Sequence, residues 1–169
     1  MGVRLATVAD AGSIAAIYND GIEDRVATFE TRLRTADDIE AWFDGRHPIL
    51  VAEDGPSVVG FASTSTYRPR DAYAGVAEFG VYVARSSRGE GIGRALMEAL
   101  ADEAAARGFW KLVSRVFVEN AASRALLMSV GFREVGIYHR HGKLDGAWRD
   151  VVIVERLIGD AGVPGSSTA

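Results

Sequence analysis

The sequence predicts one α/β (α+β) domain with a mixed, mostly antiparallel central sheet of about seven strands and helices on both of its faces. Two observations lead to this prediction. Most successive strand-like segments are joined by turns or short loops, which favours antiparallel pairing. One strand–helix–strand unit in the middle of the chain needs a crossover connection, which favours one parallel pair.

The first third of the chain contains a predicted strand at 3–6 and two predicted helices. Thr7 is expected to start the first helix, because Asp10 lies three residues further on, at the spacing of a capping box. Thr35 and Asp38 repeat this spacing at the start of the second helix. Both helices then carry apolar residues three and four positions apart, which is typical of one buried face.

The segment 24–34 between these helices has no helical period and is predicted to be a surface loop. Further strands are predicted at 49–53, 58–67, 77–83, 110–118, 132–138 and 148–157, and further helices at 94–107 and 119–130. A long polar hairpin, residues 139–147, is expected to join the last two strands. The single domain is predicted to span residues 1–158. Residues 159–169 are rich in Gly, Ser and Pro and are expected to form a disordered tail.

Composition argues against several classes of protein. A net charge of −4 and a pI of about 5.4 argue against a nucleic-acid partner. The chain has no cysteine, which excludes disulfides, a covalent cysteine intermediate and cysteine metal sites. No segment approaches the length of an apolar membrane span, and the N-terminus has no apolar signal core. A cytoplasmic location with no membrane partner is therefore expected.

The most informative stretch, residues 77–100, has the pattern of a strand, a basic glycine-rich loop and a helix. The free N–H groups and the dipole at a helix N-terminus attract anions. Arg85, Arg88 and Arg94 make a polyphosphate the preferred anion. The loop is not a P-loop, since no Lys-Ser/Thr pair follows it, and it is not a dinucleotide fingerprint, since the last glycine of that motif would fall on Arg94. An ordinary glycine-rich turn is the alternative.

The loop Arg88-Gly89-Glu90-Gly91-Ile92-Gly93 resembles the acetyl-CoA loop of the GNAT superfamily of N-acetyltransferases. The resemblance implies a GNAT fold and acetyl-CoA as the co-substrate, with its pyrophosphate on this loop and its pantetheine arm along the preceding strand. The cofactor-binding residues that it implies are Val81, Tyr82, Val83, Arg88, Gly89, Glu90, Gly91, Ile92, Gly93, Arg94, Asn120 and Ser123. For the last two, N-capping of a helix is the alternative role.

Further matches keep their order along the chain and resemble the phosphinothricin acetyltransferase-like family. They are Tyr18-Asn19, Ala27–Thr31, Glu78 ahead of Val81–Val83, Glu119–Ser123, Gly142-Lys143 and Trp148–Asp150. The resemblance implies a homodimer that acetylates the α-amino group of a small amino-acid-like toxin, such as phosphinothricin, methionine sulfoximine or sulfone, or arsinothricin. One departure is Leu127, which stands where several members have a histidine.

Glu78 is the predicted general base, because an ammonium must lose a proton to attack a thioester and a nearby carboxylate can accept it. The alternative is an edge carboxylate in a surface ion pair. Arg68 and Arg70 are predicted to bind the carboxylate and phosphinate of the substrate, with solvated loop arginines as the alternative. Phe29 and Tyr73 are candidates for the wall of the substrate pocket, although Phe29 suits the core equally.

His139 and His141 are expected on one side of a strand, but the sequence shows no third ligand, so no metal site is predicted. The leading function is a small-molecule N-acetyltransferase that transfers the acetyl group directly in a ternary complex. A protein or peptide N-terminal acetyltransferase of the same fold is one alternative. A non-catalytic acyl-CoA sensor is another.

Overall fold

The computed structural model describes residues 1–163 and contains one seven-stranded sheet in the order β1-β2-β3-β4-β5-β7-β6. Its strands are β1 (Gly2–Leu5), β2 (Ile49–Asp54), β3 (Ser57–Thr66), β4 (Val76–Val83), β5 (Lys111–Phe117), β6 (Arg133–Leu144) and β7 (Ala147–Leu157). Neighbouring strands are antiparallel, except that β4 and β5 run parallel. The predicted class, a mixed and mostly antiparallel sheet, is confirmed.

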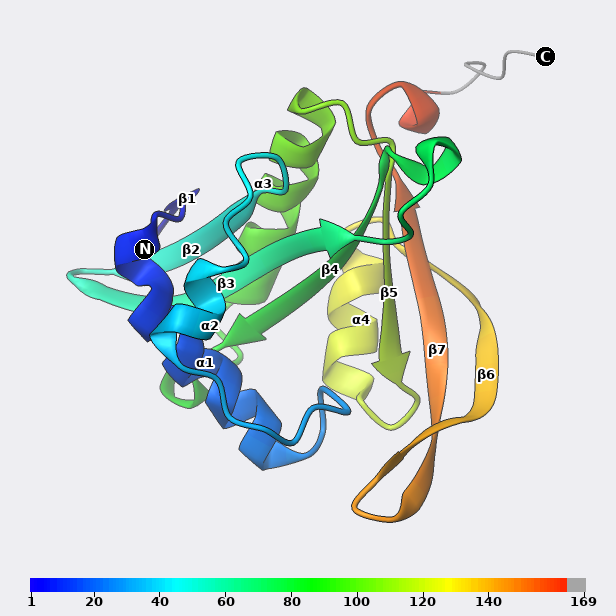
Figure 1. Ribbon diagram of the computed structural model, residues 1–169, viewed down its shortest axis with the longest axis horizontal. Coiled ribbons are helices and arrows are strands. Elements are labelled where there is room, and N and C mark those ends of the chain that lie inside the picture. Colours follow the sequence, from blue (N-terminus) through cyan, green and yellow to red (C-terminus); the bar gives the residue numbers. More distant parts are fainter. Residues whose placement is uncertain (164–169) are drawn as a thin grey trace.

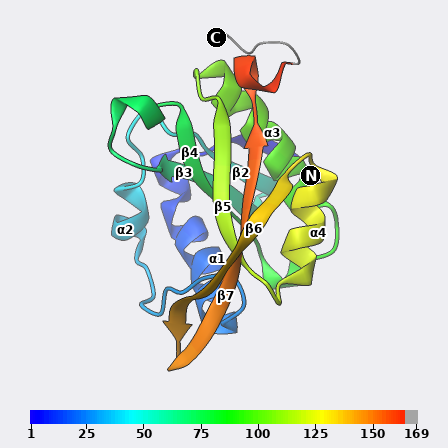
Figure 2. The same ribbon diagram turned by 90° about the vertical axis from the view of Figure 1, so that its right-hand side faces the viewer.

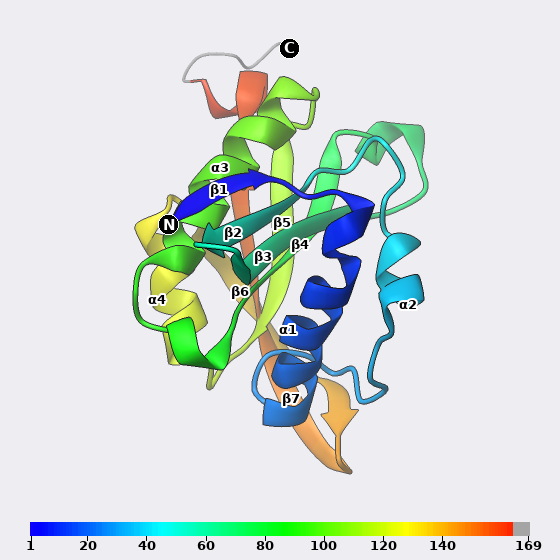
Figure 3. The ribbon, with the colours of Figure 1, turned by 90° about the vertical axis from the view of Figure 1, so that its left-hand side faces the viewer.

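Helices cover both faces of the sheet (Figure 3). The helices are α1 (Ala11–Asp24) and α2 (Ala36–Glu40) on one face, and α3 (Ile92–Ala106) and α4 (Ala121–Ser129) on the other. Leu96 and Leu100 of α3 are fully buried in the larger apolar core. On the opposite face, Ile14, Ile39 and Phe61 form part of a second core. The central strands are thus held from both sides and provide a rigid support for side chains at their ends.

β4 and β5 form a fork, which is visible in Figure 1. They pair only from Val76 opposite Lys111 to Glu78 opposite Val113, and beyond this point they separate. On its other edge β4 stays paired with β3 as far as Val83. In an antiparallel pair, every second residue turns its backbone N–H and C=O groups away from the partner. The separated part of β4 therefore presents backbone hydrogen-bonding groups to the gap of the fork.

Both predicted capping-box spacings are used at the start of a helical segment. The backbone N–H of Thr7 donates to the Asp10 carboxylate at 2.8 Å, although the first turn is a 3-10 helix, η1 (Val8–Asp10), that leads into α1. At α2 the exchange is reciprocal. The Thr35 N–H donates to the Asp38 carboxylate at 2.9 Å, and the Thr35 hydroxyl accepts from the Asp38 N–H at 3.3 Å.

The expected long polar hairpin at 139–147 is wrong. β6 continues to Leu144 and β7 begins at Ala147, so only Asp145 and Gly146 form the turn, both with positive φ (50° and 79°). This is the geometry that two-residue Asp-Gly hairpin turns adopt. The polar side chains of β6 are compatible with a strand because β6 is the edge of the sheet. Figure 2 shows β6 and β7 as one long twisted ribbon.

The chain end also differs from the expectation of a disordered tail from residue 159. Gly159–Gly162 forms a short 3-10 helix, η4, and the Gly162 N–H donates to the Ile158 carbonyl at 3.3 Å. Ile158 is buried in the larger core, which anchors this turn. The rest of the predicted tail, residues 164–169, lies outside the described residues. Among the residues that are described, no helix is both long and apolar enough to cross a membrane.

Candidate active site

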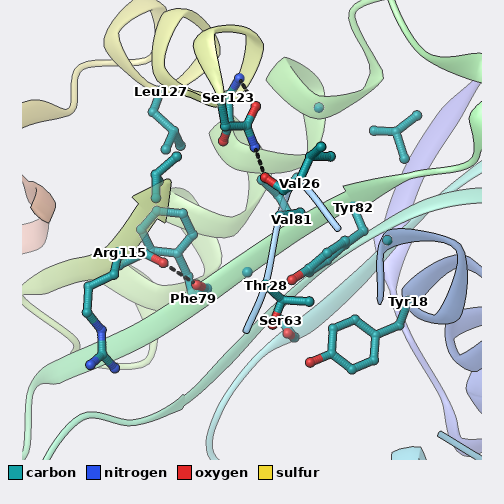
Figure 4. A pocket seen from close by; sticks show the side chains of 18 of the residues that line it. Tyr18, Val26, Thr28, Ser63, Phe79, Val81, Tyr82, Arg115, Ser123 and Leu127 are labelled. Carbon is teal, nitrogen blue, oxygen red and sulfur yellow. Dashed lines mark hydrogen bonds between the residues drawn. The ribbon is translucent and has the colours of Figure 1, made fainter. Parts of the chain in front are cut away.

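A cleft of about 1330 Å³ opens in the gap of the fork between β4 and β5. Figure 4 shows Tyr18 and Thr28 on one side of it, Ser123 and Leu127 on the other, and Val81 between them. The volume is above the usual range of about 300–1,000 Å³ for small-ligand sites. The cleft therefore has room for a long ligand and a second, smaller one. The segment 26–30, predicted to be only a surface loop, contributes to its wall.

The predicted anion-binding loop lies at one end of this cleft. Gly89 and Gly91 have φ values of 82° and 80°, a left-handed conformation that is costly for residues with a side chain. Gly91 is also the N-cap of α3, so the free N–H groups of that helix lie at the cleft. The loop residues that line the cleft are Arg88, Gly89, Gly91, Ile92, Gly93 and Arg94. Glu90 is exposed and does not line it.

The basic side chains of this loop are held by carboxylates. Asp24, at the end of α1, accepts from Arg85 at 2.8 Å and from Arg88 at 2.9 Å, while Arg94 pairs with Glu98 on its own helix. The hydrogen bond from Arg85, together with that from Arg88, holds the pKa of Asp24 below its usual range despite partial burial. The Asp24 carboxylate therefore occupies two of the three arginines around the glycine-rich loop.

Val81, Tyr82 and Val83, the residues predicted to meet a pantetheine arm, all line the cleft on the free part of β4. The Tyr82 side chain, however, packs among the aromatic residues of the second core. Its ring centroid lies 5.1 Å from that of Tyr18 and 5.3 Å from that of Phe61. Burial raises the pKa of the Tyr82 hydroxyl, so this group stays protonated at ordinary pH.

Asn120 caps α4, which was the alternative role considered for it, and also ties that helix to the segment 26–30. Its side-chain oxygen accepts from the Ser123 N–H at 3.2 Å as the N-cap of α4, and its amide nitrogen donates to the Val26 carbonyl at 3.2 Å. Both Asn120 and Ser123 line the cleft. Leu127, one turn further along α4, is fully buried and also lines it. The side chain that replaces the family histidine therefore contributes an apolar wall.

Glu78 lies at the last paired position before the fork opens, and it lines the cleft. Its carboxylate accepts from Arg115 Nη2 at 2.6 Å. The other terminal nitrogen of Arg115, Nη1, lies 3.4 Å from Nε2 of His141. Arg115 and His141 both line the cleft, and neither was recognised as a site residue from the sequence. They come from β5 and β6, far from Glu78 along the chain, so no local pattern places them beside it.

A second ion pair borders the cleft and was also missed from the sequence. Arg34 Nη2 donates to Glu30 at 2.7 Å, and the Arg34 guanidinium lies 5.8 Å from the ring centroid of Tyr18. The Asn19 side chain holds the Arg34 backbone, accepting from its N–H at 2.7 Å and donating to its carbonyl at 2.9 Å. The Tyr18-Asn19 pair, which is part of the resemblance to the family, was the available signal in the sequence, since both residues contact Arg34 in this wall.

Of the predicted substrate-binding residues, Phe29 lines the cleft and packs edge-on against Phe117, with 4.8 Å between ring centroids. The structure does not place Arg68, Arg70 and Tyr73 in the cleft. They line an adjoining depression of about 190 Å³, which borders the main cleft at Thr66. The loop that carries them joins the end of β3 to the start of β4, so it lies at the paired, closed end of the fork. Their predicted role in substrate binding stays a prediction.

The two histidines considered as a metal pair have different partners. His139 Nδ1 lies 3.1 Å from the Asp150 carboxylate, while His141 faces Arg115. A positive φ of 48° at Arg140 marks an irregularity of β6 between them. In residues 1–163, no group of three His, Asp or Glu side chains is arranged to hold a metal ion.

Comparisons with known proteins agree with this geometry. Residues 14–132 match the acetyltransferase (GNAT) family. The chain is 36% identical over 158 residues to an L-methionine sulfoximine/L-methionine sulfone acetyltransferase of Pseudomonas aeruginosa, which covers 90% of this chain and 92% of that relative.

Two solved structures are also similar. One is a ribosomal-protein-alanine N-acetyltransferase from Brucella melitensis, with a TM-score of 0.89 and 36% identity over 94% of this chain and 100% of that one. The other is a phosphinothricin acetyltransferase from Sinorhizobium meliloti in complex with AcCoA, with a TM-score of 0.88 and 29% identity over 98% of this chain and 96% of that one. The forked sheet, the glycine-rich loop and these matches together place the chain in the GNAT family of acetyltransferases, and it is an N-acetyltransferase.

Proposed function

We propose that this enzyme transfers the acetyl group of acetyl-CoA to the α-amino group of a small amino-acid-like acceptor, of the phosphinothricin, methionine sulfoximine or sulfone, or arsinothricin type. The names of the relatives support the substrate class. The observation that carries the proposal is the position of Glu78, a carboxylate at the start of the fork and inside the cleft. Acetylation of this kind detoxifies a compound that mimics an amino acid.

In this proposal the cofactor extends along the free part of β4. The pyrophosphate lies on the N–H groups of residues 89–94, and the pantetheine arm pairs with Val81–Val83 and with Asn120. Glu78 accepts a proton from the ammonium of the acceptor, and the neutral amine attacks the thioester carbon. A backbone N–H of β4 stabilises the oxyanion of the tetrahedral intermediate. The intermediate then expels the CoA thiolate, which takes the remaining extra proton from the nitrogen to leave the amide and the CoA thiol. The transfer is direct, since the chain has no cysteine to carry the acetyl group.

A second candidate is a protein N-terminal acetyltransferase, which the name of the Brucella melitensis neighbour favours. The shape of the cleft argues for the smaller acceptor. At the end of the cleft proposed for the acceptor, the segment with Phe29 lies against the β6–β7 hairpin. The contact is close, because a Cβ on Gly142 would come within 2.8 Å of the Phe29 ring.

A thiol-release assay with acetyl-CoA tests the proposal on methionine sulfone, phosphinothricin, arsinothricin and a short peptide with an N-terminal alanine. We expect turnover with the amino-acid analogues and little with the peptide, and the reverse would favour the protein acetyltransferase. Binding of CoA with no thiol release from any amine would favour a sensor. Glu78→Gln is expected to lower kcat by about 100- to 10,000-fold with acetyl-CoA affinity unchanged. Glu103→Gln, which removes a carboxylate on the far part of α3, is the matched control.

The proposal also includes a homodimer in the cytoplasm. Exposed apolar side chains on the outer strands β6 and β7, Val135, Ile137, Tyr138 and Trp148, support a surface that a second copy covers. Light scattering at micromolar protein concentration measures the oligomeric state. A monomeric mass would remove the homodimer from the proposal.

A further inference from the structure

Arg115 is the charged side chain in contact with the proposed base. It projects from β5, just beyond the point where the fork opens, and its side chain is 47% exposed to the cleft and solvent. A guanidinium carries only donors, so the nitrogen that faces it on His141 must accept with its lone pair. Arg115 thus bridges Glu78 on β4 and His141 on β6.

Two pairs of a carboxylate and a guanidinium line this end of the cleft. Glu78 is paired with Arg115 at 2.6 Å, and Glu30 is paired with Arg34 at 2.7 Å. A ligand with a single charge would leave one of these groups without a partner, which is unfavourable in a partly desolvated site. A ligand that brings one positive and one negative charge keeps the balance. The ammonium and carboxylate of an α-amino acid are bonded to one carbon atom, so they suit two protein groups that are themselves neighbours.

We propose that Arg115 binds the carboxylate of the acceptor and, by doing so, frees Glu78 for catalysis. This inference rests on the proposed function. In the ligand-free enzyme the Glu78 carboxylate is held by Arg115. The incoming carboxylate takes its place on the guanidinium, which can bind a carboxylate with paired donors. Glu78 is then left facing the ammonium on the same acceptor, and it accepts the proton. His141 is the positioning residue that keeps the Nη1 side of Arg115 turned toward the cleft.

The exchange of partners predicts which kinetic constants change. An amine without a carboxylate leaves Glu78 tied to Arg115, so kcat falls in addition to any rise in KM. If Arg115 only supported the sheet, the loss of the acceptor's carboxylate would have no special effect on kcat. The readout is therefore kcat, together with kcat/KM, compared between two acceptors that differ by one carboxylate.

The experiment compares methionine sulfone with its decarboxylated amine, 3-(methylsulfonyl)propylamine, at saturating acetyl-CoA. For the wild-type enzyme, kcat/KM is expected to be about 10- to 100-fold higher for the amino acid, as one or two charge-assisted hydrogen bonds predict. Arg115→Gln should abolish most of this preference, and Arg115→Lys should restore part of it. Arg133→Gln, which removes an exposed arginine paired with Glu155 outside the cleft, should leave the preference unchanged.

Each result bears on the inference. Equal kcat/KM for the two acceptors in the wild-type enzyme would overturn the role of Arg115 and leave the proposed function standing. Turnover of neither acceptor would overturn both. Retention of the preference in Arg115→Gln would assign carboxylate recognition to another group: Arg34, which also lines the cleft, or Arg68 and Arg70, for which the sequence predicts this role. The wild-type comparison needs no variant, so a variant that fails to fold does not prevent the test.

Discussion

The Ser114 hydroxyl donates a hydrogen bond of 2.9 Å to the carbonyl of Phe79, across the first residues that β4 and β5 do not pair. This bond limits how far the fork opens at its base. Ser114→Ala is expected to destabilise the fold by about 0.5–1.5 kcal/mol and to raise the KM for acetyl-CoA, because the Phe79 carbonyl loses its partner. Ser129→Ala, at the exposed end of α4, removes a similar hydroxyl–carbonyl bond and should leave that KM unchanged. Equal KM values for the two variants would contradict this account of the fork.

Asp24 is paired with Arg88, so we expect it to compete with CoA for this arginine. The Asp24→Asn variant is expected to bind CoA up to about 5-fold more tightly, since an exposed ion pair of up to about 1 kcal/mol no longer has to be broken. Titration calorimetry at low and high salt measures the change, which should shrink as salt increases. Glu23→Gln, which lies 3.6 Å from Arg85 and outside the cleft, is the control. Weaker binding by the Asp24 variant would mean that this carboxylate orients the arginines for the ligand.

Gly142 leaves room for Phe29. A Cβ at this position would lie 2.8 Å from the ring, so Gly142→Ala should displace Phe29, cost about 1–3 kcal/mol of stability and raise the KM for the acceptor. The double variant Gly142→Ala with Phe29→Leu should recover part of the lost stability and should lower the KM for the acceptor part of the way back. Gly136→Ala, on the same strand with open space around it, is the matched control for the glycine itself.

The cap of α2 makes one contribution to stability depend on pH. The backbone N–H of Thr35, followed by Arg32, lowers the pKa of Asp38 to about 2. A carboxyl with a depressed pKa stabilises the fold above its unfolded value of about 4, and the contribution disappears as the pH falls toward 2. Thermal melts should therefore show Asp38→Asn less stable than wild type at pH 7, with the difference vanishing near pH 2. Asp37→Asn, one residue earlier on the same turn, should show no such convergence.

Local chemistry made much of the fold predictable from the sequence. The β-branched run before the glycine-rich loop predicted β4, and the capping-box spacing at Thr35 predicted the start of α2. Each of these signals depends on residues within one turn or one strand. The hairpin between β6 and β7 was misjudged because its polar residues outweighed the Asp145-Gly146 signal, although an edge strand tolerates such residues.

The acceptor end of the cleft was the part that the sequence could not predict. In the sequence, Arg115 looks like an ordinary exposed residue of β5. Its proposed role depends on contacts with Glu78, 37 residues earlier, and with His141, 26 residues later. Periodicity and motif spacing describe neighbours along the chain. The separation of two strands, which brings these three side chains to one opening, is a property of the whole sheet.

Asn19 anchors the end of the segment that lines the proposed acceptor site, through two hydrogen bonds to the Arg34 backbone. The side chain that does this belongs to a helix packed on the sheet, so the attachment does not depend on the identity of the residues in between. Insertions or replacements within 26–33 can therefore reshape the acceptor site while both ends of the segment stay in place. Variation of this one stretch is a direct route by which enzymes of this architecture could acquire new acceptors without rebuilding the site for the acyl donor.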